Sequence, residues 1–144
     1  MSQARDQRLF HLLQVSAHRL KTELDRATLD AGGLTAAQAG VLAVIARAEG
    51  LTQKEVAEQL RQQESAITAM AGRLIKAGLV DRTPHPTDGR AWRLTLTPEG
   101  AEALDAFRAP MDRFNAAITQ AVGGEDEVAA LAKALRALIE ADLS

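Results

Sequence analysis

The sequence predicts a mainly α-helical fold that contains one small β-hairpin. Hydrophobic residues make up 47% of the chain but aromatic residues only 3%, so most apolar residues are Ala and Leu, which favour helices. Apolar positions follow the helical repeat almost throughout, and only residues 79–97 change to the two-residue repeat of strands. With 144 residues, the chain is predicted to form a single domain with its own core.

The N-terminal part predicts two helices. The first is long and amphipathic and spans residues 4 to about 30, because apolar residues recur every three or four positions, at Leu9, Leu12, Leu13, Leu20, Leu24 and Ala27. It is expected to end near Gly32-Gly33. The second begins at Thr35, which forms a capping box with Gln38 three residues later, and it ends near Gly50.

Two shorter helices follow. Thr52 and Glu55 repeat the capping box, and the helix that they open spans Gln53 to Leu60. A further helix is predicted from Glu64 to Ala77, with Gly78 as its C-terminal stop. Its apolar residues form one stripe that we expect to be buried, namely Ile67, Met70, Ala71, Leu74 and Ile75. Two short helices joined by a tight turn indicate a helix-turn-helix.

Residues 79–97 predict a hairpin with a long exposed loop. Trp92, Leu94 and Leu96 alternate with polar residues, so they share one face, and Trp92 is expected to have a packing role. Residues 79–83 can pair with that strand. The connecting segment PHPTDGR is rich in Pro, Asp and Gly, which favour turns.

Two C-terminal helices complete the chain. Thr97 as the cap and Pro98 at the first position open one helix, which ends near Gly123-Gly124, and the last helix spans residues 125–143. The apolar residues of the last helix lie along one seam, at Val128, Leu131, Leu135, Leu138 and Leu143. Together with the N-terminal helix, these helices carry more apolar surface than one chain needs for its own core, which indicates packing against a second copy.

The composition excludes several classes of protein. The chain has no cysteine, which excludes disulfides, thiolate metal sites and thiol redox sensing. No apolar run approaches the roughly 20 residues needed to cross a bilayer, and the first residues lack a signal-peptide core, so no membrane association and a cytoplasmic location are expected. The net charge is −2, but residues 47–98 carry 8 basic and 6 acidic side chains, whereas residues 99–144 carry 4 basic and 9 acidic. The mildly basic middle region can attract phosphate.

A helix-turn-helix followed by a β-hairpin is the plan of a winged helix, and four segments carry a more specific resemblance. They are LTAAQAGVLAVIA, LTQKEVAEQL, ITAMAGRLIKAGLVDR and DGRAWRLTLTPEGAEAL. With these four segments in this order, the sequence resembles the MarR family of bacterial transcription regulators. The resemblance implies a winged helix-turn-helix region over residues 34–97, with the helix-turn-helix at about 51–77 and the wing at about 79–97. Residues 4–33 and 98–143 would supply dimerisation helices.

The resemblance implies a homodimer that binds a pseudo-palindromic operator in double-stranded DNA, as a repressor released by a small aromatic or lipophilic effector. The helix over residues 64–77 would lie in the major groove, because its outward residues are small and polar. Gln62 and Gln63 could bond adenine edges, while Ala69 and the methyl group of Thr68 could touch thymine methyl groups. The residues expected to bind DNA are Thr52, Gln53, Lys54, Gln62, Gln63, Ser65, Thr68, Ala69, Arg73, His85 and Arg90.

In the family the hairpin is the wing, and the matching arginine, Arg90, would reach toward the minor groove, where negative potential is concentrated. Asp88 would shape the loop by holding a neighbouring guanidinium, and His85 would meet a phosphate. For Arg82 and Arg93 two roles stay open: they could contact DNA, or they could form ion pairs at the base of the hairpin. A solvated surface is the alternative for the helix face and the wing alike.

The chain departs from the commoner family pattern at two positions. Ala69 stands where Arg or Lys is often found, and Gly89 replaces a frequent second arginine of the loop. Both changes lower the positive charge of the predicted interface. The affinity for DNA should therefore depend more on base contacts and dimer geometry, or be weaker.

The residues predicted to line an effector pocket are His11, His18, Arg47, Phe107 and Met111, each of which could instead have a core or surface role. No cofactor or metal is expected: His11 and His18 lie seven residues apart, roughly 10 Å along one helix, although a site with ligands from another helix stays open. No nucleophile–base pair or phosphate-binding glycine loop indicates an enzyme. The alternative function is a winged-helix protein-interaction module, such as an antirepressor.

Overall fold

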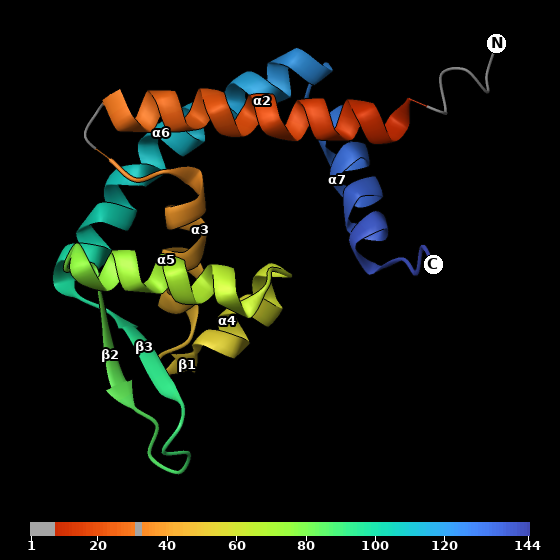
Figure 1. The fold of residues 1–144 in the computed structure, drawn as a ribbon. Helices are drawn as coiled ribbons and strands as arrows, with labels where there is room; N and C mark the ends of the chain where they lie inside the picture. Colours follow the sequence, from red (N-terminus) through yellow and green to blue (C-terminus); the bar gives the residue numbers. More distant parts are fainter. Residues whose placement is uncertain (1–7, 31–32) are drawn as a thin grey trace. The chain divides into compact units, whose positions relative to one another are not determined.

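The computed structural model describes residues 8–30 and 33–144, and the chain divides into two compact units, residues 1–108 and 109–144. Helices dominate, and the first unit also contains a three-stranded antiparallel sheet (Figure 1). The predicted class, mainly α with a small hairpin, is confirmed. The elements are α2 (Leu9–Asp30), α3 (Ala36–Arg47), β1 (Leu51–Thr52), α4 (Gln53–Leu60), α5 (Glu64–Lys76), β2 (Val80–Pro84), β3 (Trp92–Leu96), α6 (Pro98–Val122) and α7 (Glu125–Glu140).

Both predicted capping boxes are formed. At the start of α3, the Thr35 hydroxyl accepts the backbone N–H of Gln38 at 3.2 Å, and Gln38 Oε1 accepts the N–H of Thr35 at 3.0 Å. Thr52 and Glu55 make the same pair of bonds at the start of α4, at 3.2 and 3.4 Å. Each box satisfies N–H groups that the first helical turn leaves without partners, so both helix starts are fixed by local sequence.

The core of the first unit lies where α3, α4, α5 and β3 meet. Its largest fully buried apolar side chains come from all of these elements and from β2: Leu42, Ile45, Val56, Ile67, Leu74, Val80 and Leu94. On α5, the residues Ile67, Ala71 and Leu74 are buried, while Met70 and Ile75 are half-buried. The predicted stripe therefore faces the core, which leaves the opposite side of α5 exposed.

The hairpin pairs β2 with β3 in a register that joins Val80 to Leu96 and Pro84 to Trp92. A third strand, β1, was not predicted: it adds to the other edge of β3, with Leu51 opposite Leu94. Trp92, which was predicted to have a packing role, is 41% exposed, and its ring packs against the guanidinium of Arg82. It is the first residue of β3, next to the loop of the hairpin.

A tight joint connects the hairpin to α6. The Thr97 hydroxyl donates to the carbonyl of Gly78 at 2.6 Å and accepts the N–H of Gly100 at 3.0 Å, as its predicted role as a cap requires. The N–H of Thr97 donates to the carbonyl of Leu79 at 3.1 Å. A Cβ on Gly100 would overlap that same carbonyl. Glycine at position 100 is therefore required for α6 to start this close to the hairpin.

Several helix ends refine the predicted bounds. Helix α5 ends at Lys76, and Gly78 follows with φ +77°, a conformation that favours glycine and stops the helix as predicted. Helix α7 ends at Glu140, so the prediction of a helix to residue 143 was wrong. Residues 4–7 and Gly32 lie outside the described residues.

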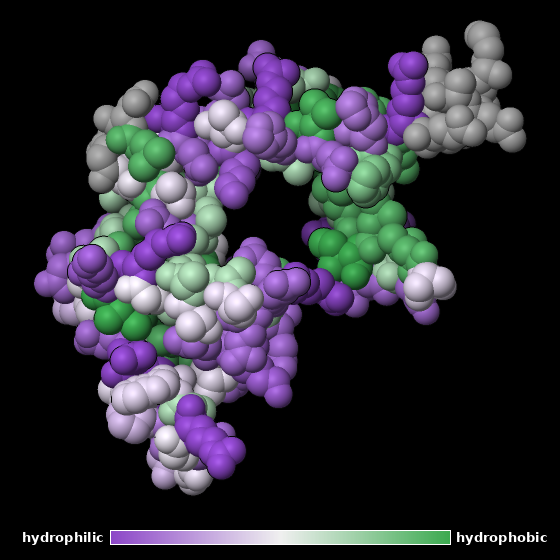
Figure 2. Space-filling view, in the orientation of Figure 1, coloured by the Kyte–Doolittle hydropathy of each residue, from purple (hydrophilic) through white to green (hydrophobic). Residues whose placement is uncertain are grey.

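No residue of α7 is buried. Its apolar side chains gather on one surface, which Figure 2 shows as a hydrophobic area over this helix. The exposed members are Leu131, Leu135, Leu138 and Ile139. Among the described residues, no helix is both long and apolar enough to span a lipid bilayer.

Candidate nucleic-acid interface

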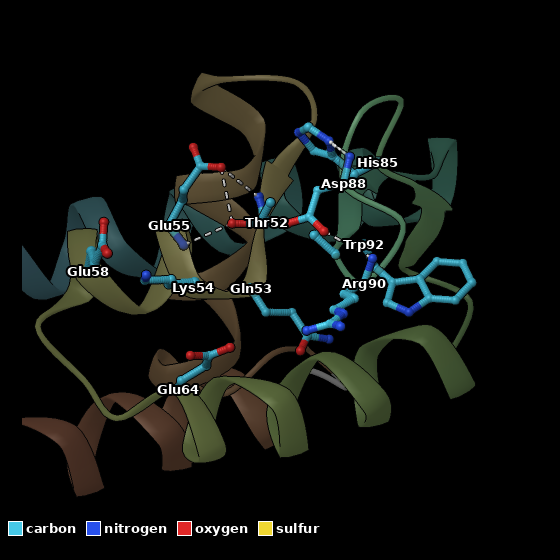
Figure 3. Close-up of a pocket in the computed structure, with 11 residues that line it drawn as sticks. Thr52, Gln53, Lys54, Glu55, Glu58, Glu64, His85, Asp88, Arg90 and Trp92 are labelled. Atoms are coloured by element: carbon cyan, nitrogen blue, oxygen red, sulfur yellow. Dashed lines mark hydrogen bonds between the residues drawn. The ribbon is translucent and has the colours of Figure 1, made fainter.

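An open groove of about 520 Å³ lies between the start of α4, the start of α5 and the loop of the hairpin (Figure 3). Six residues singled out by the sequence line it: Thr52, Gln53, Lys54, His85, Asp88 and Arg90. The other lining residues are Glu55, Glu58, Glu64, Ala91 and Trp92. The fold thus brings the predicted wing and the first turns of both helices of the helix-turn-helix to one groove.

The first turn of α4 forms one wall of the groove. Thr52 and Gln53 are half-buried, and Lys54 is exposed. The carboxylate of Glu55 already lies at this helix start, because Glu55 Oε1 accepts the Thr52 hydroxyl at 3.0 Å. The negative charge of Glu55 would repel a phosphate bound at this helix N-terminus, so the positive charge of Lys54 would have to offset that repulsion.

The outward face of α5 carries the remaining predicted DNA contacts. Gln62 and Gln63 precede the helix, and the other four residues lie on it. All six are exposed: Gln62, Gln63, Ser65, Thr68, Ala69 and Arg73. The Thr68 hydroxyl lies 2.9 Å from both Glu64 O and Gln53 Oε1, and its single proton can be donated to one of them at a time. The bond to Gln53 links the two helices of the helix-turn-helix across 15 residues of sequence.

The loop of the hairpin is folded by its own side chains. His85 Nδ1 accepts the backbone N–H groups of Thr87, at 3.2 Å, and of Asp88, at 3.1 Å. Asp88 Oδ1 accepts the N–H of Arg90 at 3.1 Å. Asp88 therefore shapes the loop through the backbone of Arg90, whereas a bond to a guanidinium was predicted. With Nδ1 accepting, a neutral His85 carries its proton on Nε2, which leaves that atom as a donor for a phosphate.

The arginines at the base of the hairpin have structural contacts. The guanidinium of Arg82 lies over the Trp92 ring, 4.6 Å from its centroid, which is the geometry of a cation–π contact. The guanidinium of Arg93 lies directly against Gly50, where it would overlap any Cβ. Both side chains pack on neighbours of the sheet, so Arg90 is the arginine that the hairpin extends into the groove.

Electrostatically the groove is mixed. It contains the cations of Lys54 and Arg90 but also four carboxylates, those of Glu55, Glu58, Glu64 and Asp88. Charge counting along the sequence gave a mildly basic middle region and did not reveal that three glutamates converge here. Their spacing over two helices becomes informative only once the helix packing is known.

The five predicted effector residues do not line this groove. His11 and His18 are exposed on α2, and Arg47 is exposed at the end of α3. Phe107 is buried in the first unit, and Met111 is half-buried in the second. An effector pocket made from these residues stays a prediction.

Comparison with known proteins identifies the family. The MarR family model matches residues 32–91 of this chain. The multiple antibiotic resistance protein MarR of Salmonella typhimurium is 32% identical over 107 residues, which cover 74% of this chain and 74% of that protein. This chain belongs to the MarR family. The HTH-type transcriptional repressor MdtR of Bacillus subtilis is 35% identical over 97 residues, which cover 65% of this chain and 63% of MdtR, so the chain spans less than two thirds of the length of MdtR.

Solved structures of MarR family members show the same fold. The transcriptional repressor CouR, bound to a 23-mer DNA duplex, has a TM-score of 0.84 and 27% identity, and the match covers 92% of each chain. The PcaV transcriptional regulator from Streptomyces coelicolor, in complex with its natural ligand, has a TM-score of 0.78 and 27% identity, with coverage of 92% of this chain and 90% of PcaV. These relatives are transcription regulators and not enzymes, and this chain has their winged-helix fold.

Proposed function

We propose that this MarR family chain is a homodimeric transcriptional repressor that binds a pseudo-palindromic DNA site and is released by a small ligand. The observation that carries the proposal is the common groove between α5 and the wing, with Arg90 on one wall and Glu64 of the first α5 turn on the other (Figure 3). Because α5 and the wing flank the same groove of the protein, α5 can enter the major groove of a DNA duplex while the wing enters the adjacent minor groove. CouR, which shares the fold, is bound to a DNA duplex in its structure.

Helix α5 is the element that fits the major groove. Its buried stripe fixes which side points outward, and that side carries Ser65, Thr68, Ala69 and Gly72, all exposed. These side chains are short, so the helix backbone can approach the base edges closely. Arg73, further along the same side, is placed for a phosphate contact beyond the bases.

Arg90 is the residue that fits the minor groove. It is exposed in the loop of the hairpin, and its backbone is held by Asp88. Because a narrow minor groove concentrates negative potential, one arginine there contributes more than a surface phosphate contact. His85 and Lys54 lie on opposite walls of the same groove and would position the backbone phosphates.

The terminal helices support a dimer. Leu9, Phe10 and Leu12 of α2 are more than half exposed, and α7 exposes its own apolar row. Exposed apolar surface of this extent favours association, and a second copy supplies complementary helices. Two winged helices set roughly 34 Å apart would then bind successive turns of one side of the duplex.

Release by a ligand rests on the family and on PcaV, whose structure contains its natural ligand. A small aromatic or lipophilic compound that binds one spacing of the two α5 helices better than the other would shift the dimer between binding and non-binding forms. His11, His18, Arg47, Phe107 and Met111 remain the proposed lining. Titration of aromatic acids into the protein–DNA complex tests this part.

The test of DNA binding compares Arg90→Ala with the unchanged chain on duplexes from its own upstream region. Loss of the minor-groove contact should weaken binding by about 1–3 kcal/mol, roughly 5- to 150-fold. Arg26→Ala is the matched control, because Arg26 is an exposed arginine of α2 that pairs with the exposed Glu23 at 3.6 Å, and the affinity of this variant for DNA should stay unchanged. Equal affinity of the Arg90→Ala variant and the unchanged chain would instead favour a protein-interaction module such as an antirepressor.

A further inference from the structure

We propose that Gln53 is a specificity-determining positioning residue, which turns Thr68 so that its methyl group, and not its hydroxyl group, faces the bases and recognises thymine. The inference rests on the proposed function, because it assumes that α5 lies in the major groove. The starting observation is the bond between the Thr68 hydroxyl and Gln53 Oε1 at 2.9 Å.

The Thr68 hydroxyl is occupied on two sides. Besides Gln53 Oε1, it lies 2.9 Å from the carbonyl oxygen of Glu64, one helical turn back. A hydroxyl has one proton, and it goes to one or the other of these two acceptors, so none is left to donate to a guanine or thymine oxygen. A rotated Gln53 amide would donate to the same oxygen, and the hydroxyl would still be engaged.

The remaining branch of Thr68 is its methyl group. Because Cβ is tetrahedral and its oxygen is turned to α4 and to the backbone of α5, the methyl group is directed away from both contacts. Thr68 is exposed, and so are its outward neighbours Ala69 and Gly72. Thr68 and Ala69 therefore present methyl groups, with no side chain at Gly72 to shield them, and these suit the C5 methyl group of thymine, the one apolar feature of the major groove.

Gln53 lies where the start of α4 directs it toward Thr68. It is the first residue of α4, directly after the capping box of Thr52 and Glu55, and it is half-buried. Its side chain extends from α4 toward α5 beside Arg90 (Figure 3). Without it, the hydroxyl would keep only its bond to the helix backbone and could rotate toward a base edge.

The experiment removes single methyl groups from both sides of the interface. Duplexes are selected from a random-sequence pool by the unchanged chain, and each thymine is then replaced by deoxyuridine, which lacks only the methyl group. At least one replacement per half-site should weaken binding about fourfold, the factor for burial of one methyl group. Thr68→Ser should bind the thymine and deoxyuridine duplexes equally, whereas Thr68→Val should keep the penalty.

The role of Gln53 is tested on the same pair of duplexes. Gln53→Ala should lower the deoxyuridine penalty to less than twofold, and Gln59→Ala, an exposed glutamine of the same helix, should leave it at fourfold. Circular dichroism of each variant checks that it is folded. An unchanged penalty in Gln53→Ala or Thr68→Ser overturns the inference while DNA binding stands, whereas failure of the unchanged chain to select any duplex overturns the proposed function as well.

Discussion

Gly100 provides a test of how the wing is attached to α6. In Gly100→Ala, the new Cβ would meet the carbonyl group of Leu79, whose carbon lies 2.9 Å from the Cβ position. Helix α6 would have to move away, which also lengthens the 3.1 Å bond from the Thr97 N–H to that carbonyl. Overpacking and one weakened bond cost about 2–4 kcal/mol, and the better helix propensity of Ala returns about 1 kcal/mol. The expected loss in the free energy of unfolding is therefore about 1–3 kcal/mol.

Gly40→Ala is the matched control, because Gly40 also lies within a helix, but among the described residues no atom outside its own stretch of helix backbone comes within 4 Å of its Cβ position. This variant should gain about 0.5–1 kcal/mol from helix propensity. Thermal unfolding followed by circular dichroism and by the fluorescence of Trp92, the only tryptophan, would measure both at one protein concentration. At roughly 3–4 °C per kcal/mol for a chain of this length, the midpoint should fall by roughly 3–12 °C in Gly100→Ala and rise by roughly 2–4 °C in Gly40→Ala. Equal midpoints for the two variants would refute the steric explanation of Gly100.

Three further changes probe the interface and the dimer. Glu64→Gln removes a carboxylate from the groove, so affinity for arbitrary duplex DNA should rise roughly two- to fivefold in a filter-binding assay at low salt, and no rise would mean that this wall lies away from phosphate. Asp88→Ala frees the N–H of Arg90 and should weaken DNA binding about threefold without changing the thermal midpoint. The control Asp81→Ala on β2 should change neither the DNA affinity nor the midpoint. Leu135→Glu places a charge in the apolar row of α7 and should convert the proposed dimer to monomers in sedimentation velocity, while Glu140→Gln at the end of that helix should keep the mass of the unchanged chain.

The sequence predicted the features whose causes are local. The capping boxes at Thr35 and Thr52 each need only two side chains three residues apart, and both were formed as predicted. The strand β1 was missed because two residues are too short to show a period, and its second residue was already identified as a helix cap. The partial exposure of Trp92 could not be predicted, because alternation along a strand predicts a face but not how far each end of that face is covered.

The site itself depends on packing between distant segments, which one sequence does not display. The bond from Thr68 to Gln53 joins residues 15 apart, and neither has a pattern that predicts the other as its partner. The carboxylates of Glu55, Glu58 and Glu64 are spread over two helices and converge only when α4 packs on α5. Residue types therefore indicated which face to examine, and the tertiary structure determined which groups on that face are already engaged.

Binding of labelled duplexes from the chain's own upstream region, measured by fluorescence anisotropy over a series of salt concentrations together with the mass of the complex, tests the proposed regulator. Two chains per duplex are expected, with an affinity that falls steeply as salt rises because several phosphates are contacted. A single unassociated chain whose anisotropy signal shows no salt-dependent binding to any of these duplexes would contradict it.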